Sequence, residues 1–182
     1  MSVLSYKAII KHYETSPDEV KKFFENTPKL VTDFDYEVAI GYVFLRTELG
    51  LNRSIYCGVV KLHRGDYEIC RNAINVQHMT REGFLNLFKN VYGKDLPANI
   101  RSKIKGAESI RDRVLHGKKV RDPEMRKAIC DVLDYAKEMN IFLNSEAGFM
   151  PFGDLRGFKG RTKALDKKTT RWILKGMGFG IK

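Results

Sequence analysis

The chain has 182 residues and a formal charge of +11, from 33 Lys and Arg against 22 Asp and Glu. This length fits one domain with an extension, and 43% apolar with 11% aromatic residues supplies a core and excludes disorder throughout. Its apolar runs are far shorter than the roughly 20 residues of a membrane helix, and its first residues lack the apolar core of a signal peptide, so we expect an intracellular, cytoplasmic protein.

The first part of the chain shows helix signals in quick succession. A capping box at Ser16-Pro17-Asp18-Glu19 predicts the start of a short helix that ends at Asn26-Thr27-Pro28. A second helix begins near Asp33, carries a wide apolar face and stops at Leu49-Gly50. Residues 53–79 are predicted to be helical with a break at Gly65.

Three further helices follow. The first is capped by Thr80 and closed by Gly93, the second runs from Pro97 to Gly117, and the third covers residues 123–144 after the Asp122-Pro123 cap. The pattern therefore predicts an all-α bundle of about five helices over residues 32–144, preceded by a helical segment at 1–31. Residues 145–182 read as a basic, Gly-rich extension with one short helix, which Trp172 is expected to pin to the bundle.

Several chemistries lack the residues that they need. The chain has three cysteines, Cys57, Cys70 and Cys130. Because the number is odd and no CxxC pair occurs, we predict free thiols and no disulfide framework. The spacing of Cys57, His63 and Cys70 matches no zinc signature, and the sequence has no P-loop, GxGxxG, HExxH or GxSxG motif. We therefore expect neither a metal nor a cofactor.

The positive charge indicates a polyanionic partner such as RNA. Residues 145–182 hold nine basic and three acidic side chains, so this extension carries more than half of the excess. Flexible basic stretches bind phosphate backbones without reading base sequence. Within the extension we assign RNA binding to Arg156, Arg161 and Lys163, and the alternative is a solvated surface segment without a partner.

One short segment combines groups that can act on a phosphodiester. It is Arg111-Asp112-Arg113-Val114-Leu115-His116-Gly117, near the end of a predicted helix. Asp112 and His116 are four residues apart and share a helix face, where a carboxylate can orient an imidazole. Arg113 lies within reach of His116, and a basic turn follows with Lys118 and Lys119. We assign RNA binding to these three side chains as well. The alternative is a structural histidine that interacts with the last carbonyls of the helix.

This segment resembles the signature of the HEPN family (higher eukaryotes and prokaryotes nucleotide-binding), whose domains are all-α bundles. The signature is an Arg, then four to six residues, then a His, often with a polar residue after the Arg. Arg111, Asp112 and His116 fit it, and the likeness extends over residues 32–144. Arg71 and His78 give a second match, so the sequence leaves two candidate motifs.

The resemblance implies a metal-independent endoribonuclease that acts as a homodimer in a toxin, stress-response or antiviral defence role. In such enzymes the Arg stabilises phosphate charge and the His helps to move a proton from the RNA 2′-hydroxyl to the leaving oxygen. An antitoxin or regulatory protein is a further implied partner. One subgroup, paired with a nucleotidyltransferase antitoxin, has Tyr where this chain has Lys118, which argues against that pairing.

A second hypothesis needs no catalysis. HEPN-like domains without activity exist, so the same basic surface would serve a helical module that binds RNA, nucleotide or a protein partner.

Overall fold

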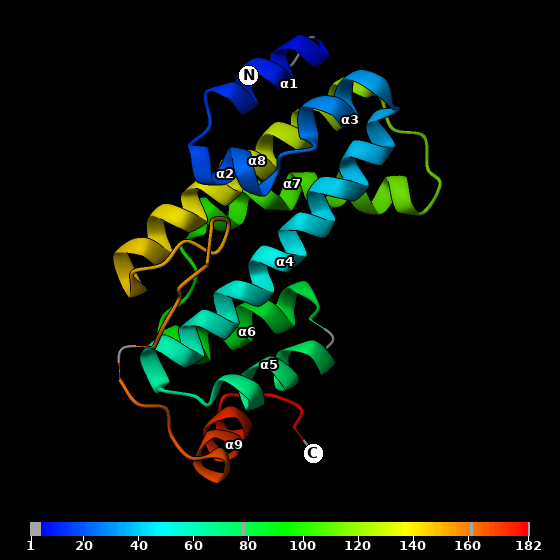
Figure 1. The fold of residues 1–182 in the computed structure, drawn as a ribbon. Helices are drawn as coiled ribbons and strands as arrows, with labels where there is room; N and C mark the ends of the chain where they lie inside the picture. Colours follow the sequence, from blue (N-terminus) through cyan, green and yellow to red (C-terminus); the bar gives the residue numbers. More distant parts are fainter. Residues whose placement is uncertain (1–4, 78, 161, 182) are drawn as a thin grey trace. The chain divides into compact units, whose positions relative to one another are not determined.

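The computed structural model describes residues 5–77, 79–160 and 162–181, and every regular element within these ranges is an α-helix (Figure 1). The all-α bundle predicted from the sequence is thereby confirmed. The helices of the described residues are α1 (Tyr6–Glu14), α2 (Asp18–Phe23), α3 (Thr27–Asp33), α4 (Tyr36–His63), α5 (Tyr67–Val76), α6 (Arg81–Tyr92), α7 (Ala98–Leu115), α8 (Asp122–Ala147) and α9 (Lys167–Gly176).

The chain forms two compact units, which interleave along the sequence. Unit 1 comprises Met1–Gly50, Pro97–Phe142 and Phe152–Asp154, and unit 2 comprises Leu51–Leu96, Leu143–Pro151 and Leu155–Lys182. Helices α4 and α8 each contribute to both units. The division of the chain at residues 31 and 144 stays a prediction about domains.

The core of unit 1 centres on Phe152, whose side chain is fully buried. The Phe23 ring meets it edge-on at 5.3 Å between centroids, Tyr135 does so at 6.1 Å, and Phe24 stacks on it at 6.2 Å. Rings in these offset and T-shaped arrangements add to the stabilisation that burial provides. Asn140 fixes the same segment, because its buried amide both donates to the Phe152 carbonyl and accepts from the Phe152 N–H.

Three elements in unit 1 differ from the sequence prediction. Helix α4 continues through Gly50, where a Cβ would lie 2.2 Å from the Phe152 ring, so the missing side chain makes room for that ring and does not stop the helix. Pro28 does not end a helix but stands in the first turn of α3, a position that suits its missing N–H. The predicted capping box is also wrong, since α2 begins after Pro17 without a side-chain cap.

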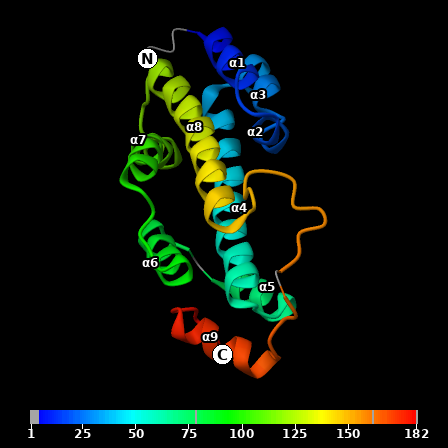
Figure 2. The same cartoon turned by 90° about the vertical axis from the view of Figure 1, so that its left-hand side faces the viewer.

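Unit 2 contains the predicted break at Gly65, and α6 begins and ends at the expected residues. The Thr80 hydroxyl accepts a hydrogen bond from the Gly83 N–H at the start of α6, and Gly93 ends that helix with φ of 67°. Phe84 and Phe88 of α6 lie in the core. Helix α9 packs against α5 (Figure 2).

Trp172 corrects one expectation about unit 2. It lies on the outer side of α9 and is 71% exposed, so it does not pin the helix. The inner side of α9 is occupied by Thr170 and Leu174, which are both fully buried.

Candidate functional site at the end of helix α7

The candidate motif lies in unit 1, where α7 ends in a glycine-dependent turn. His116 is the C-cap residue, and Gly117 follows in the left-handed region with φ of 64°. The Gly117 N–H donates to the Val114 carbonyl at 3.0 Å and the Lys118 N–H to the Arg113 carbonyl at 2.9 Å, which is the Schellman arrangement. This turn sets the backbone of His116 at the end of the helix and leaves its side chain exposed.

Arg111 is held by two carboxylates and an aromatic ring. Its Nε and Nη2 donate to one Asp112 oxygen at 3.0 and 2.8 Å, and its Nη1 lies 3.8 Å from a Glu48 oxygen on α4. The guanidinium carbon lies 4.9 Å from the centre of the Phe44 ring. A phosphate that binds Arg111 must therefore compete with these carboxylates for the same N–H donors.

The structure does not bring the Asp112 carboxylate and the His116 imidazole into a hydrogen bond. The Asp112 oxygen accepts two charge-assisted hydrogen bonds from the neighbouring Arg111 guanidinium. The contact between His116 and Asp112 is a backbone hydrogen bond of 3.0 Å, in which the His116 N–H donates to the Asp112 carbonyl. No hydrogen bond or ion pair joins the His116 side chain to any residue within the described ranges.

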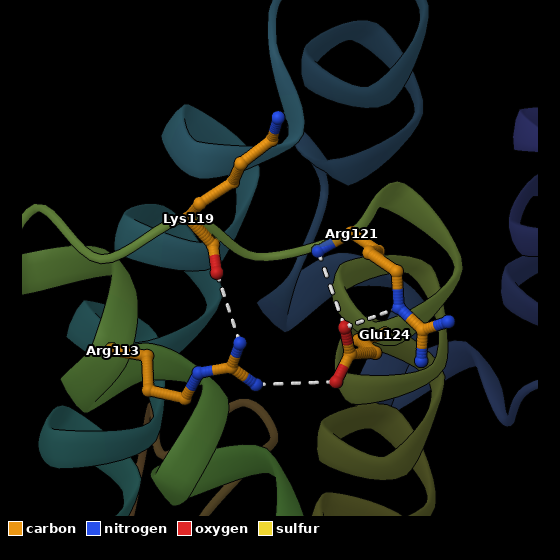
Figure 3. A network of polar contacts seen from close by, with 4 residues as sticks. All are labelled: Arg113, Lys119, Arg121 and Glu124. Carbon is orange, nitrogen blue, oxygen red and sulfur yellow. Dashed lines mark hydrogen bonds and ion pairs between the residues drawn. The ribbon is translucent and has the colours of Figure 1, made fainter.

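Arg113 closes the turn between α7 and α8 instead of facing solvent freely (Figure 3). Its guanidinium donates to Glu124 at 3.1 Å and to the Lys119 carbonyl at 2.9 Å. The same Glu124 carboxylate accepts from the backbone and the side chain of Arg121. Hydrogen bonds from Arg121, and then from Arg113, hold the pKa of Glu124 below its usual range.

Two lysines in this turn present free side chains to solvent. Lys118 and Lys119 are both exposed, and the Lys119 ammonium points away from the Arg113–Glu124 contacts (Figure 3). With Arg121, whose side chain is 81% exposed, they surround the end of α7 with positive charge. Glu48 and Phe44 are the neighbours of the motif that sequence reasoning missed, because they precede it by more than 60 positions and no local pattern connects them.

The candidates in the C-terminal extension belong to unit 2. Arg156 and Lys163 are exposed, and the Lys163 carbonyl accepts from Arg64 at 3.0 Å, while Arg161 lies outside the described residues. The second motif is described only in part, since His78 also lies outside them. Arg71 lies beside Tyr56, where burial raises the pKa of the tyrosine and Arg71 opposes that effect.

The two units differ sharply in charge. Unit 1 has 17 basic and 16 acidic side chains, a formal charge of +1, whereas unit 2 has 16 basic and six acidic ones, a formal charge of +10. The excess positive charge that indicated a polyanionic partner therefore lies almost entirely in unit 2, whereas the candidate motif lies in unit 1.

The described residues contain no group of three His, Cys, Asp or Glu side chains placed to hold a metal ion. Among the same residues, no helix combines the length and the apolar character needed to span a membrane. Comparisons with protein-family models, with curated protein sequences and with solved structures find no match.

Proposed function

We propose that this protein is an RNA-cleaving enzyme of the HEPN type, with its reaction centre at the end of α7. The observation that supports it best is the exposed His116 imidazole, which has no side-chain partner in the described chain and is followed by Lys118 and Lys119. A residue that moves a proton on a bound substrate must be accessible and free to change partners. Basic side chains around it attract the phosphate backbone.

In the proposed reaction the RNA 2′-hydroxyl attacks the adjacent phosphorus as its proton is removed. The bond to the 5′-oxygen breaks, and that oxygen leaves with a proton. The products are a 2′,3′-cyclic phosphate and a 5′-hydroxyl end, and no metal is needed. His116 carries the proton, and Arg111 stabilises the negative charge on the phosphate oxygens after exchanging a carboxylate for the phosphate. DNA lacks the 2′-hydroxyl and is not cut.

The family likeness adds a homodimer in which two α7 ends meet, and a cellular role as a toxin or in stress response or defence under the control of an antitoxin or regulatory protein. Lys118, Lys119, Arg156, Arg161 and Lys163 would contact phosphates. Arg113 has a lesser part in binding, because its donors are committed to Glu124 and the Lys119 carbonyl.

The test compares wild-type protein with His116→Ala on structured and single-stranded RNA in EDTA, with matching DNA as a substrate control. His12→Ala is the matched control, because it also removes a histidine of unit 1. Unlike His116, His12 already has a side-chain partner, since its Nε2 lies 3.0 Å from an Asp134 oxygen. We expect cyclic phosphate ends from wild type and His12→Ala and at least a hundredfold loss of cleavage in His116→Ala, in line with a positioned proton-transfer group. Equal cleavage by all three proteins would contradict the assignment to His116 and direct attention to Arg71 and His78.

A second candidate, a non-catalytic RNA-binding module, is favoured by one observation. Unit 2 carries a formal charge of +10, whereas the motif lies in unit 1 with its Arg111 already engaged by Asp112 and Glu48. RNA binding without cleavage by any of the proteins, in the same assay, would support this candidate.

A further inference from the structure

Helix α9 in unit 2 carries a stripe of cations around an exposed tryptophan. Lys168, Arg171, Trp172 and Lys175 follow one another at three- and four-residue spacing, so they share the outer face of the helix over about 10 Å. The Lys168 ammonium lies 6.0 Å from the centre of the Trp172 ring. None of the three cations is ion-paired within the described part of the chain.

The helix that carries this stripe is anchored at its first turns and at its end. The Thr170 hydroxyl accepts from the Asp66 N–H at 3.1 Å, and the Lys167 ammonium lies 2.6 Å from Glu68. At the other end, the Asn90 amide donates to the Met177 carbonyl at 2.8 Å. Trp172 is therefore held outward by a fixed helix.

A cavity of about 500 Å³ adjoins the stripe within unit 2. Arg171 belongs to both, and Asn72 of α5 adds an amide that can donate and accept hydrogen bonds. The other lining residues are Ile69, Ala73, Val76, Gly180 and Ile181. The cavity thus combines an apolar wall with one cation and one amide. This combination suits a nucleobase that lies next to a phosphate group.

We propose that the outer face of α9 binds single-stranded RNA, with the Trp172 ring stacked on a base and Lys168, Arg171 and Lys175 at phosphates. The inference rests on the proposed RNA-acting function and names the surface that holds the strand. Stacking on exposed aromatics between cations is the usual means of binding single strands without reading sequence. The formal charge of +10 on unit 2 is complementary to the phosphate chain.

An anionic membrane surface fits this helix less well. A helix that lies in a membrane interface turns its apolar face to the lipid. In α9 that face, with Thr170 and Leu174, is buried within unit 2, and Trp172 stands alone among cations on the outer face.

Trp172 is the only tryptophan of the chain, so its fluorescence reports on this surface directly. The test titrates full-length His116→Ala protein with a single-stranded oligouridine RNA, with a duplex RNA of the same length, and with heparin as a polyanion without bases. We expect the single strand to quench the emission of Trp172 strongly, and heparin to bind with little quenching. Using the His116→Ala background keeps the RNA intact.

Affinity is then measured from the anisotropy of labelled oligouridine RNA with variants made in the same background. Trp172→Ala should weaken binding at least fivefold, the low end of the range for one stacked base, while Trp172→Phe keeps most of the affinity. Phe34→Ala is the matched control, because Phe34 is another exposed aromatic ring, 52% exposed, in unit 1. Lys175→Ala should lower the slope of log affinity against log salt by about 0.7, and Lys137→Ala in unit 1 should not.

The inference is overturned if oligouridine RNA leaves Trp172 emission unchanged, if Trp172→Ala binds as tightly as its parent, or if vesicles of anionic lipid shift the emission and displace the RNA. Quenching by RNA without any cleavage by the wild type would refute the nuclease proposal and support the binding surface. Cleavage by the wild type with unchanged Trp172 emission would support the nuclease proposal and refute the binding surface.

Discussion

The amide of Asn140 offers the sharpest test of how unit 1 is held together. Asn140 on α8 is 5% exposed, its Nδ2 donates to the Phe152 carbonyl at 3.1 Å, and its Oδ1 accepts from the Phe152 N–H at 2.8 Å. Asn140→Ala leaves both backbone groups buried without a partner. Each unsatisfied group costs about 1–3 kcal/mol, and the better helix propensity of Ala returns up to about 0.7 kcal/mol.

We therefore expect Asn140→Ala to lower the free energy of unfolding by about 3 kcal/mol. For a chain of this length that corresponds to a fall of roughly 6–12 °C in the unfolding midpoint. The measurement is urea and thermal unfolding followed by far-ultraviolet circular dichroism. Asn144→Ala is the control, because Asn144 lies one turn further along α8 and is exposed. If Asn140→Ala and Asn144→Ala lower the free energy of unfolding by the same small amount, the Asn140 amide does not hold the Phe152 segment and the reasoning is refuted.

Three further predictions concern the turn after α7 and the cysteines. Gly117→Ala forces a side chain into the left-handed region and should destabilise the protein by about 1–2 kcal/mol, whereas Gly106→Ala in the middle of α7 should stabilise it by up to about 1 kcal/mol, as urea unfolding will show. The pKa of Glu124 is lower in the folded protein than in the unfolded chain, so its ionised carboxylate stabilises the fold at a pH above the unfolded pKa. This stabilisation is lost as the pH falls through the folded pKa. Glu124→Gln should therefore make the free energy of unfolding depend less on pH on the acidic side. Burial raises the pKa of all three cysteine thiols to about 12, so a thiol reagent at neutral pH should modify them only after denaturant is added.

Local signals predicted the helices whose ends depend on one residue. Thr80 starts a helix by accepting a backbone hydrogen bond, and Gly93 ends the same helix by taking a positive φ. Such ends need only the cap residue and its nearest neighbours, so a sequence pattern contains them. Gly50 shows the limit of this reasoning, because its place inside α4 follows from the Phe152 ring, which lies about 100 positions away in the chain.

The candidate site shows the same limit at the level of single side chains. Helical spacing placed Asp112 and His116 on one face, but spacing does not show that the neighbouring Arg111 competes for the carboxylate. It also gives no hint of Glu48, which belongs to another helix. The exposure of Trp172, in contrast, could have been predicted from the sequence. Lys168, Arg171 and Lys175 surround it at helical spacing, which indicates that this face of the helix is in contact with solvent.

Helix termination and phosphodiester chemistry make different demands on the end of α7. Termination requires Gly117, since φ of 64° favours a residue without a side chain, and it places residue 116 at the cap. It does not require residue 116 to be histidine, nor does it require the two lysines that follow. Those identities are the ones that proton transfer on a bound phosphate would use. Because unit 2 carries almost all of the excess charge, the face proposed to bind the strand and the proposed reaction centre lie in different units.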